Sequence, residues 1–278
     1  MPRCAAAFAL SLSIKLKIGI VGHDMISLTG KSALITGGSR GIGAAAVRLF
    51  AQAGADVVFN YHRNRAAAER VTQEARKHGT RVESFKANLG NSAEGKRLVQ
   101  FARDRLGHLD ILVANAGIWN DKDIAIENMS EQQWDEMMRV NLKSVYSTIH
   151  HAVPQMIAQK SGKIVAVSST AGQRGEAMHT HYGASKGAII SFVKGLSTEL
   201  AKHNILVNCV APGWVDTEMS QPVLNTKAGW KSATKAIPLG RVGAAEEIAS
   251  AILFLASDLA SFITGEVLNV NGGAVLCG

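Results

Sequence analysis

A glycine-rich turn between a short apolar segment and an amphipathic one constrains the fold more than any other feature of this chain. The apolar segment 32–36 predicts a strand, and the pattern G-x-x-x-G-x-G follows it at 37–43. Apolar residues then recur at helical spacing to about Ala53, and a second strand is predicted over 56–61. This order of strand, turn, helix and strand is the βαβ unit, which predicts parallel strands joined by a right-handed crossover.

The same alternation runs along the rest of the chain. Helices are predicted over 65–78, 92–106, 131–159, 182–203 and 244–256, and further strands over 81–86, 110–113, 163–167, 206–210 and 266–270. No repeat, linker or low-complexity segment divides them. The predicted fold class is α/β: a doubly wound, parallel, seven-stranded sheet of the Rossmann type in a single domain.

Composition excludes some classes of function. The chain has 278 residues, 47% of them hydrophobic, which is enough for a large core. Its formal net charge of +8 is spread along the chain without a basic run, so we expect neither a nucleic-acid partner nor a membrane. The three cysteines are far apart, which predicts no metal site and favours a reducing, cytoplasmic location.

The N-terminal segment 1–27 is predicted to be a poorly ordered extension ahead of a domain spanning 28–278. Its first 23 residues contain no acid, and the apolar run 4–12 is too short to cross a bilayer. A targeting segment is one interpretation. A start codon placed upstream of the true one, with Met25 as the real start, is the interpretation we favour, because 28–31 resembles a turn that leads into the first strand.

The glycine turn predicts a dinucleotide site. A turn between a strand and a helix presents backbone N–H groups and the positive end of the helix to a phosphate. Gly37 would allow the tight turn, Gly41 the close approach of a pyrophosphate, and Gly43 the close packing of the helix.

The end of the second strand discriminates between NAD(H) and NADP(H). A carboxylate there would bind the ribose 2′-hydroxyl and repel a 2′-phosphate, but the chain reads Asn-Tyr-His-Arg-Asn at 60–64. Arg40 and Arg63 could bind a 2′-phosphate through their planar guanidinium groups. We therefore predict NADP(H) in preference to NAD(H); solvated arginines without a ligand are the alternative.

A second motif pairs a phenol with an ammonium group. Tyr182 and Lys186 are four residues apart, so they lie on one face of a helix. A free phenol has a pKa near ~10, and a neighbouring cation is expected to lower it. Ser169, at the end of the apolar run 164–167, could hydrogen-bond the substrate oxygen that Tyr182 protonates.

Together these motifs resemble those of the short-chain dehydrogenase/reductase family, over residues 28 to 273. The matching segments occur in the family's order: 36–43, 115–117, Asn141, Ser169, Tyr182 with Lys186, 208–213, and Thr217. The resemblance implies a catalytic set of four. Tyr182 would be the general acid or base, Ser169 would orient the substrate oxygen, Lys186 would lower the phenol pKa and hold the nicotinamide ribose, and Asn141 would anchor a water chain to Lys186.

The resemblance also implies which residues bind the cofactor. They are Gly37, Ser39, Arg40, Gly41, Ile42, Gly43, Tyr61, Arg63, Asn88, Leu89, Asn115, Ala116, Gly117, Tyr182, Lys186, Pro212, Gly213 and Thr217. Two positions depart from the common family pattern. Asn88 stands where many members have Asp, and Ala114 where many have Asn; we expect both changes to be tolerated.

Substrate contacts are predicted less sharply. Trp119, Met178, His179 and Trp214 flank the motifs, and 218–238 corresponds to the family's variable lid, which suggests an aromatic, apolar pocket. Core packing explains the two tryptophans equally well.

Within the family the chain is most similar to 3-oxoacyl-acyl-carrier-protein reductases. This implies a ketone reductase whose substrate is a small molecule or is linked to an acidic carrier, with Lys160 and His203 at the positions of docking arginines, and a homotetramer. Lys227, Lys231 and Lys235 of the lid would also favour an acidic partner. The alternatives are a dehydrogenase of a sugar, steroid or other secondary alcohol, and a protein that senses NADP without turnover.

Overall fold

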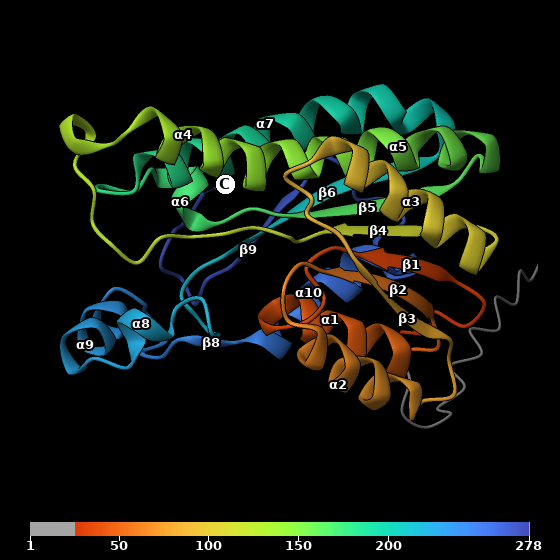
Figure 1. Ribbon diagram of the computed structural model, residues 1–278, viewed down its shortest axis with the longest axis horizontal. Coiled ribbons are helices and arrows are strands. Elements are labelled where there is room, and N and C mark those ends of the chain that lie inside the picture. Colours follow the sequence, from red (N-terminus) through yellow and green to blue (C-terminus); the bar gives the residue numbers. More distant parts are fainter. Residues whose placement is uncertain (1–25, 278) are drawn as a thin grey trace, which may run out of the picture.

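The computed structural model describes residues 26–277, and their fold is a seven-stranded parallel sheet covered by helices on both faces (Figure 1). The strands are β1 (Ser32–Ile35), β2 (Asp56–Tyr61), β3 (Val82–Lys86), β4 (Ile111–Ala114), β5 (Gly162–Val167), β6 (Ile205–Pro212) and β9 (Val267–Val270). Their order across the sheet is β3-β2-β1-β4-β5-β6-β9, and every neighbouring pair is parallel. The predicted fold class is confirmed.

Helices form the two outer layers. They are α1 (Gly41–Gln52), α2 (Arg65–Arg76), α3 (Ser92–Leu106), α4 (Glu131–Met137), α5 (Ser144–Gln159), α6 (Thr170–Arg174), α7 (Thr180–Leu200), α8 (Gln221–Leu224), α9 (Lys227–Lys235) and α10 (Ala245–Ala256). In Figure 1, α1, α2 and α10 cover one face of the sheet, and α3, α5 and α7 cover the other. Short 3₁₀ turns occupy Ile126–Asn128, Ala201–His203 and Asp258–Ala260.

Both faces of the sheet are buried, because each is packed against a helical layer. Neighbouring residues of a strand therefore enter different halves of the core: Ala33 and Ile35 pack with α1 and α10, whereas Leu34 between them packs with α3 and α5. This explains why the strand sequences are continuously apolar instead of alternating.

The strand order places the site. Crossovers from β1 lead outward to β2 and β3, and the chain then returns to β4 on the other side of β1. The carboxyl ends of β1 and β4 thus flank the topological switch point, where ligands bind in open α/β sheets. The glycine turn follows β1, and the Asn-Ala-Gly segment 115–117 follows β4.

Three local features were not predicted. The helical region 131–159 is divided by a π-helical segment, Met138–Lys143. The five-residue helix α6 follows β5, and α7 begins at Thr180, two residues before Tyr182. Within the lid, α8 and α9 pack on a small apolar cluster of their own, and the two-residue strands β7 (Val215–Asp216) and β8 (Gly243–Ala244) pair at its base.

The predicted N-terminal extension falls almost entirely on residues outside those described. Among the helices of 26–277, none is long and apolar enough to cross a membrane. The same part of the chain contains no group of three or more His, Cys, Asp or Glu side chains arranged to hold a metal ion.

Candidate active site

The glycine turn is closely packed against the end of β4. Gly37 and Gly41 have positive φ angles of 69° and 51°, which glycine adopts without strain. A side chain at Gly43 would collide with the Gly37 carbonyl oxygen and lie 2.6 Å from Asn115 Nδ2. The turn therefore has its tight course only because these positions lack a Cβ atom.

Asn115 and Thr36 join the two strands that flank the switch point. Asn115 Nδ2 donates to the Thr36 carbonyl at 2.9 Å, and the Thr36 hydroxyl accepts from the backbone N–H groups of Asn115 and Ala116, each at 2.9 Å. On the other side, the backbone N–H of Gly37 donates to Asn60 Oδ1 at 2.7 Å. Asn115 and Ala116 thus hold the turn in place, which is a structural role.

The turn fits the pyrophosphate of a dinucleotide. The N-terminus of α1 has no side-chain cap, so its first N–H groups remain available to an anion. Thr217 from the lid side lies over the turn, with its Cγ2 3.2 Å from where a Cβ of Gly41 would be. Backbone donors are therefore present at the turn, and the contact of Thr217 with Gly41 is a feature that the sequence did not predict.

Two arginines lie at the start of α1 and just after β2. Arg40 and Arg63 are exposed, and neither forms an ion pair with any residue of 26–277. Between them in the sequence, His62 has a lowered pKa, chiefly through burial and then through the charges of Arg63 and Lys86. Protonation of the imidazole is thus opposed by cations already present, which indicates a field suited to an anion.

Asn88 and Leu89 follow β3 at the same edge of the sheet. The Asn88 side chain accepts a hydrogen bond from the Gly90 N–H at 3.2 Å, so it shapes the turn, and Leu89 is buried. Tyr61 is half-buried at the end of β2. These three residues lie in the region expected for the adenosine half of a dinucleotide.

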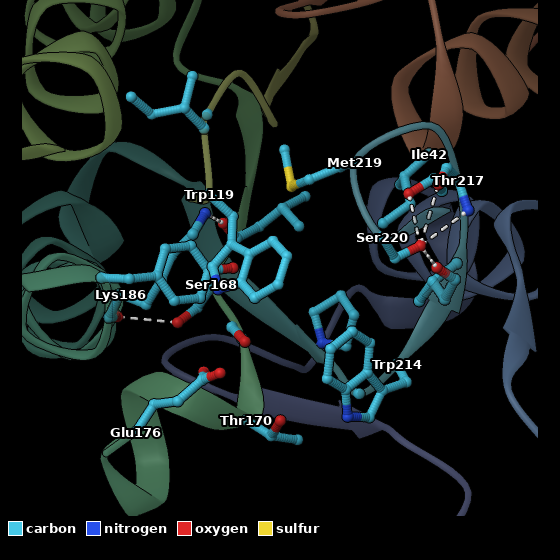
Figure 2. A pocket seen from close by; sticks show the side chains of 18 of the residues that line it. Ile42, Trp119, Ser168, Thr170, Glu176, Lys186, Trp214, Thr217, Met219 and Ser220 are labelled. Atoms are coloured by element: carbon cyan, nitrogen blue, oxygen red, sulfur yellow. Dashed lines mark hydrogen bonds between the residues drawn. The ribbon is translucent and has the colours of Figure 1, made fainter. Parts of the chain in front are cut away.

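Tyr182 and Lys186 lie together in the first turns of α7. Lys186 Nζ is 5.8 Å from the centre of the Tyr182 ring and donates to the Val167 carbonyl at 2.9 Å. The Ser168 hydroxyl donates to the Lys186 carbonyl at 2.8 Å, as Figure 2 shows. A Cβ at Gly172 would lie 2.6 Å from the Lys186 carbonyl carbon, so this glycine lets α6 approach α7 closely.

Burial shifts the pKa values of both groups. It raises the pKa of Tyr182 to about 12, with the Ser169 hydrogen bond lowering it and the Glu176 charge raising it further. It also lowers the pKa of Lys186 to about 8. The raised phenol pKa is opposite to the direction expected from the sequence, because desolvation of the phenolate outweighs the Ser169 hydrogen bond that lowers the pKa.

Ser169 lies between β5 and α6. Its oxygen accepts the Ala171 N–H at 3.1 Å as the N-cap of α6. That bond occupies a lone pair and leaves the hydroxyl proton free to donate. Ser169 can therefore donate to the Tyr182 oxygen or to a substrate oxygen next to it.

Asn141 is fully buried within the π-helical segment. Its Oδ1 accepts from the Ile118 N–H at 2.7 Å, and its Nδ2 donates to the Ile118 carbonyl at 3.0 Å and the Ser185 hydroxyl at 3.2 Å. A Cβ at Gly117 would lie 3.1 Å from Asn141 Oδ1 and 3.5 Å from Lys186 Nζ. The π-segment thus brings Asn141 toward Lys186, in keeping with the common occurrence of such bulges at functional sites.

One pocket combines predicted catalytic and cofactor residues. Ile42, Asn115, Gly117, Trp119, Ser169, Tyr182, Lys186, Pro212, Gly213, Trp214 and Thr217 all line it. The other predicted cofactor residues lie in the turn, after β4 and at the ends of β2 and β3. Asn141 does not line the pocket but contacts Ile118, which does.

The predicted substrate residues take different positions. Trp119 and Trp214 meet edge to face, with ring centroids 5.9 Å apart, and both line the pocket (Figure 2). His179 stacks on Trp119 with centroids 5.0 Å apart, so it positions the indole without lining the cavity. Met178 is exposed and has a positive φ angle of 64°. The tryptophans are therefore pocket walls as well as packing partners.

The sequence analysis missed several pocket residues, including the two charged ones other than Lys186. Glu176, in the loop between α6 and α7, points into the pocket (Figure 2), and Arg174 lines the same side. The available signal was a lone acid between Ser169 and Tyr182, which a loop of unknown course could not place.

Comparison with known proteins decides the family. The family model described as "Enoyl-(Acyl carrier protein) reductase" matches residues 37–275. The chain belongs to the short-chain dehydrogenase/reductase family. It is thus an oxidoreductase that acts on a keto or hydroxyl group with a nicotinamide cofactor.

Similar reductases come from several bacteria. The chain is 41% identical to the 3-oxoacyl-[acyl-carrier-protein] reductase FabG of Chlamydia trachomatis (88% of this chain, 98% of the relative) and 41% identical to that of Thermotoga maritima (90% and 99%). The protein of the same name from Staphylococcus aureus is 39% identical (87% and 97%). The solved structure titled "Crystal structure of gox2181" superposes with a TM-score of 0.85 at 32% identity, covering 89% of this reductase and 96% of that chain.

Proposed function

We propose that this chain is an NADPH-dependent reductase whose substrates are 3-oxoacyl thioesters of acyl carrier protein. Tyr182 is the proton donor. The observation that carries the proposal is the convergence of Ser169, Tyr182 and Lys186 on one pocket beside the glycine turn. About 40% identity to named 3-oxoacyl-[acyl-carrier-protein] reductases over nearly the whole chain supports the substrate class.

The pKa values favour reduction. With a pKa of about 12, the Tyr182 phenol stays protonated at neutral pH and is ready to donate to an oxygen that gains charge. Ser169 donates a second hydrogen bond to that oxygen, and Lys186 contributes positive charge near the reacting centre. The bound nicotinamide supplies the hydride, and the protein supplies orientation and the proton.

The preference for NADP(H) rests on charge at the end of β2. Arg40 and Arg63 are exposed and free of ion pairs within the described chain, and no carboxylate occupies residues 60–64. Two guanidinium groups suit the 2′-phosphate of NADP(H), whereas a 2′-hydroxyl would leave them without a ligand.

The positions matched to docking arginines lie far from the pocket of the same copy. Lys160 ends α5 and His203 follows α7, both before the amino ends of β5 and β6, and Asn204 Nδ2 donates to the Lys160 carbonyl at 3.4 Å. Tyr182 and His203 are 21 residues apart, which along a helix is roughly 30 Å. Lys160 and His203 would therefore flank a pocket only if a second copy packs antiparallel along α7.

A homotetramer would provide such a neighbour. Tyr146 and Phe192 of α5 and α7 lie with ring centroids 6.5 Å apart on a groove that Met138 and Leu142 also line, and Tyr146 is 46% exposed. At one edge of the sheet, β9 is the terminal strand and Phe262, which precedes it in the chain, is fully exposed. Tyr146→Glu is expected to reduce the mass measured by light scattering, whereas Trp230→Glu in the lid is expected to leave it unchanged.

The lid offers a second cationic surface at the end of the molecule that holds the pocket. Lys227, Lys231 and Lys235 are exposed and recur every four residues along α9. An acidic carrier could contact them while its substrate enters the pocket. Within residues 26–277 the thiols of Cys209 and Cys277 are free, which is consistent with a cytoplasmic location for such an enzyme.

The test is NADPH oxidation with a panel of carbonyl substrates. Acetoacetyl thioesters of N-acetylcysteamine and of acyl carrier protein should be reduced, the carrier-linked form with the lower KM. Preferential turnover of a sugar, ketosteroid or secondary alcohol would replace this proposal with the dehydrogenase alternative. NADPH binding without turnover of any carbonyl would support the sensing alternative.

A further inference from the structure

Glu176 is a pocket carboxylate that the proposed chemistry does not use. It lies between α6 and α7, lines the cavity with Tyr182 and Lys186, and points into it in Figure 2. Its side chain is 19% exposed. A carboxylate buried to this degree is normally paired or hydrogen-bonded, because its desolvation is costly.

No side chain within 26–277 provides that pairing. The nearest basic side chain is that of His179, whose Nδ1 is 4.0 Å from Glu176 Oε1 and 3.9 Å from Asp123 Oδ1, too far for a hydrogen bond. The Arg174 guanidinium donates instead to the Gly175 carbonyl at 3.1 Å. The acceptor capacity of Glu176 is therefore directed at the cavity and is not used by the protein.

The surroundings decide which donor would fit. Trp119 and Trp214 form aromatic walls of the cavity that Glu176 lines, and His179 stacks on Trp119. Lys186 and Arg174 line the same cavity and would repel a cationic substrate. A neutral hydroxyl avoids this repulsion. It can donate a hydrogen bond to the carboxylate while the carbon atoms next to it lie against the indole rings.

We propose that Glu176 determines specificity by accepting a hydrogen bond from a substrate hydroxyl, so that the pocket selects ketones with a hydroxyl next to the reacting carbonyl. This rests on the proposed ketone reduction and narrows its substrate class. Among 3-oxoacyl thioesters, the favoured ones carry a hydroxyl on the acyl chain, and the unsubstituted ones are poorer substrates.

The experiment compares two thioesters that differ by one oxygen. Wild-type enzyme is assayed with NADPH on the N-acetylcysteamine thioesters of 4-hydroxy-3-oxobutanoate and 3-oxobutanoate. A hydrogen bond to a charged acceptor predicts a kcat/KM ratio of roughly 10 to 100 in favour of the hydroxylated substrate. Glu176→Leu should bring this ratio close to 1, while Glu176→Gln should retain part of it, because the amide oxygen still accepts.

The pH dependence of the ratio provides a second readout. Burial raises the pKa of Glu176, the charges of His179 and Arg174 oppose that shift, and the Asp123 charge adds to it. Tyr182 faces it from α7. Only the ionised carboxylate is a strong acceptor, so the preference should be lost as the pH falls through the pKa of Glu176, and Glu176→Gln should remove this dependence.

Asp123→Asn is the matched control, because Asp123 is an exposed acid near His179 that does not line the pocket. It should leave the ratio unchanged. Equal kcat/KM for the two thioesters in wild type, or an unchanged ratio in Glu176→Leu, would overturn the inference. Failure to reduce either thioester would instead overturn the proposed function, so the two failures are distinguishable.

Discussion

The Lys186 ammonium lies 5.8 Å from the centre of the Tyr182 ring and is hydrogen-bonded to the Val167 carbonyl at 2.9 Å. The bond fixes the ammonium against the end of β5, one turn of α7 away from the phenol. Burial then acts on both groups in opposite directions, toward neutral lysine and neutral tyrosine. The site thus holds a protonated phenol beside the Lys186 ammonium. Because the ammonium is buried, its charge destabilises the folded state.

Because burial of the charged ammonium destabilises the folded state, we expect Lys186→Met to stabilise the protein while abolishing turnover. The folded-state pKa of about 8 lies below the ordinary 10.5, so charged Lys186 destabilises the fold at pH values below 8. We expect the free energy of unfolding at pH 7 to rise by roughly 1–3 kcal/mol. The gain should shrink as the pH rises from 8 through 10.5, because the lysine is increasingly neutral in both states.

Denaturant unfolding at pH 7 and pH 10 measures this, with Lys194→Met at an exposed position of α7 as the control. An equal gain at both pH values would show that packing, and not charge, is responsible.

Removing the arginines at the β2 end should change cofactor preference. Arg40→Ala and Arg63→Ala should each weaken NADPH binding by roughly 10- to 100-fold, the effect expected for lost charge-assisted hydrogen bonds, and should leave NADH binding within about threefold. Titration of cofactor fluorescence measures both constants. Arg70→Ala, on the exposed side of α2, is the control. Equal losses for the two cofactors would contradict the assignment.

Two glycines of the catalytic helices should respond oppositely to alanine. Gly195 in α7 is exposed and has open space where a Cβ would be, so Gly195→Ala should stabilise the protein by about 0.5–1 kcal/mol. A Cβ at Gly172 would meet the Lys186 backbone at 2.6 Å, so Gly172→Ala should destabilise it and reduce kcat. Thermal unfolding measures the stability of both variants, and initial rates measure their kcat. A Gly172→Ala enzyme with the stability and kcat of wild type would contradict the close contact.

Alcohol oxidation should depend on pH through Tyr182 and Glu176. Oxidation needs the phenolate as base, so its rate should rise with pH toward the raised pKa of Tyr182. The negative charge of Glu176 contributes to that raised value, so Glu176→Gln should move the rising limb to lower pH. Oxidation rates from pH 7 to 11 test this, with Asp123→Asn expected to superpose on wild type.

The alternation of strands and helices, the position of the turn and the face shared by Tyr182 and Lys186 were predictable because each follows from a short local pattern. The apolar run and the glycines at 37–43 specify a βαβ unit, and the remaining alternation leaves few topologies. Ser169 follows β5, and Thr217 comes shortly after the end of β6, the parallel neighbour of β5. Because the carboxyl ends of parallel strands lie at the same edge of a sheet, both residues line one pocket.

What could not be predicted depends on contacts between distant segments. The π-segment around Asn141 changes the backbone hydrogen bonding without a distinctive sequence, and the course of the loop that presents Glu176 depends on α6, which has only five residues. The pKa of Tyr182 depends on burial, which sequence spacing does not reveal. The sequence therefore led us to expect that Lys186 would lower the pKa of Tyr182, whereas burial of the phenol raises it.

Substitution of the phenol tests the central claim most directly. Tyr182→Phe removes one oxygen from a half-buried side chain, so the fold and the glycine turn should be unaffected. With NADPH and the acetoacetyl thioester of N-acetylcysteamine, kcat should fall by roughly 10²- to 10⁴-fold while the Kd for NADPH stays within about twofold of wild type. Tyr146→Phe, outside the pocket, should match wild type in both. A Tyr182→Phe enzyme that retains its kcat would contradict the assignment of this phenol as the proton donor.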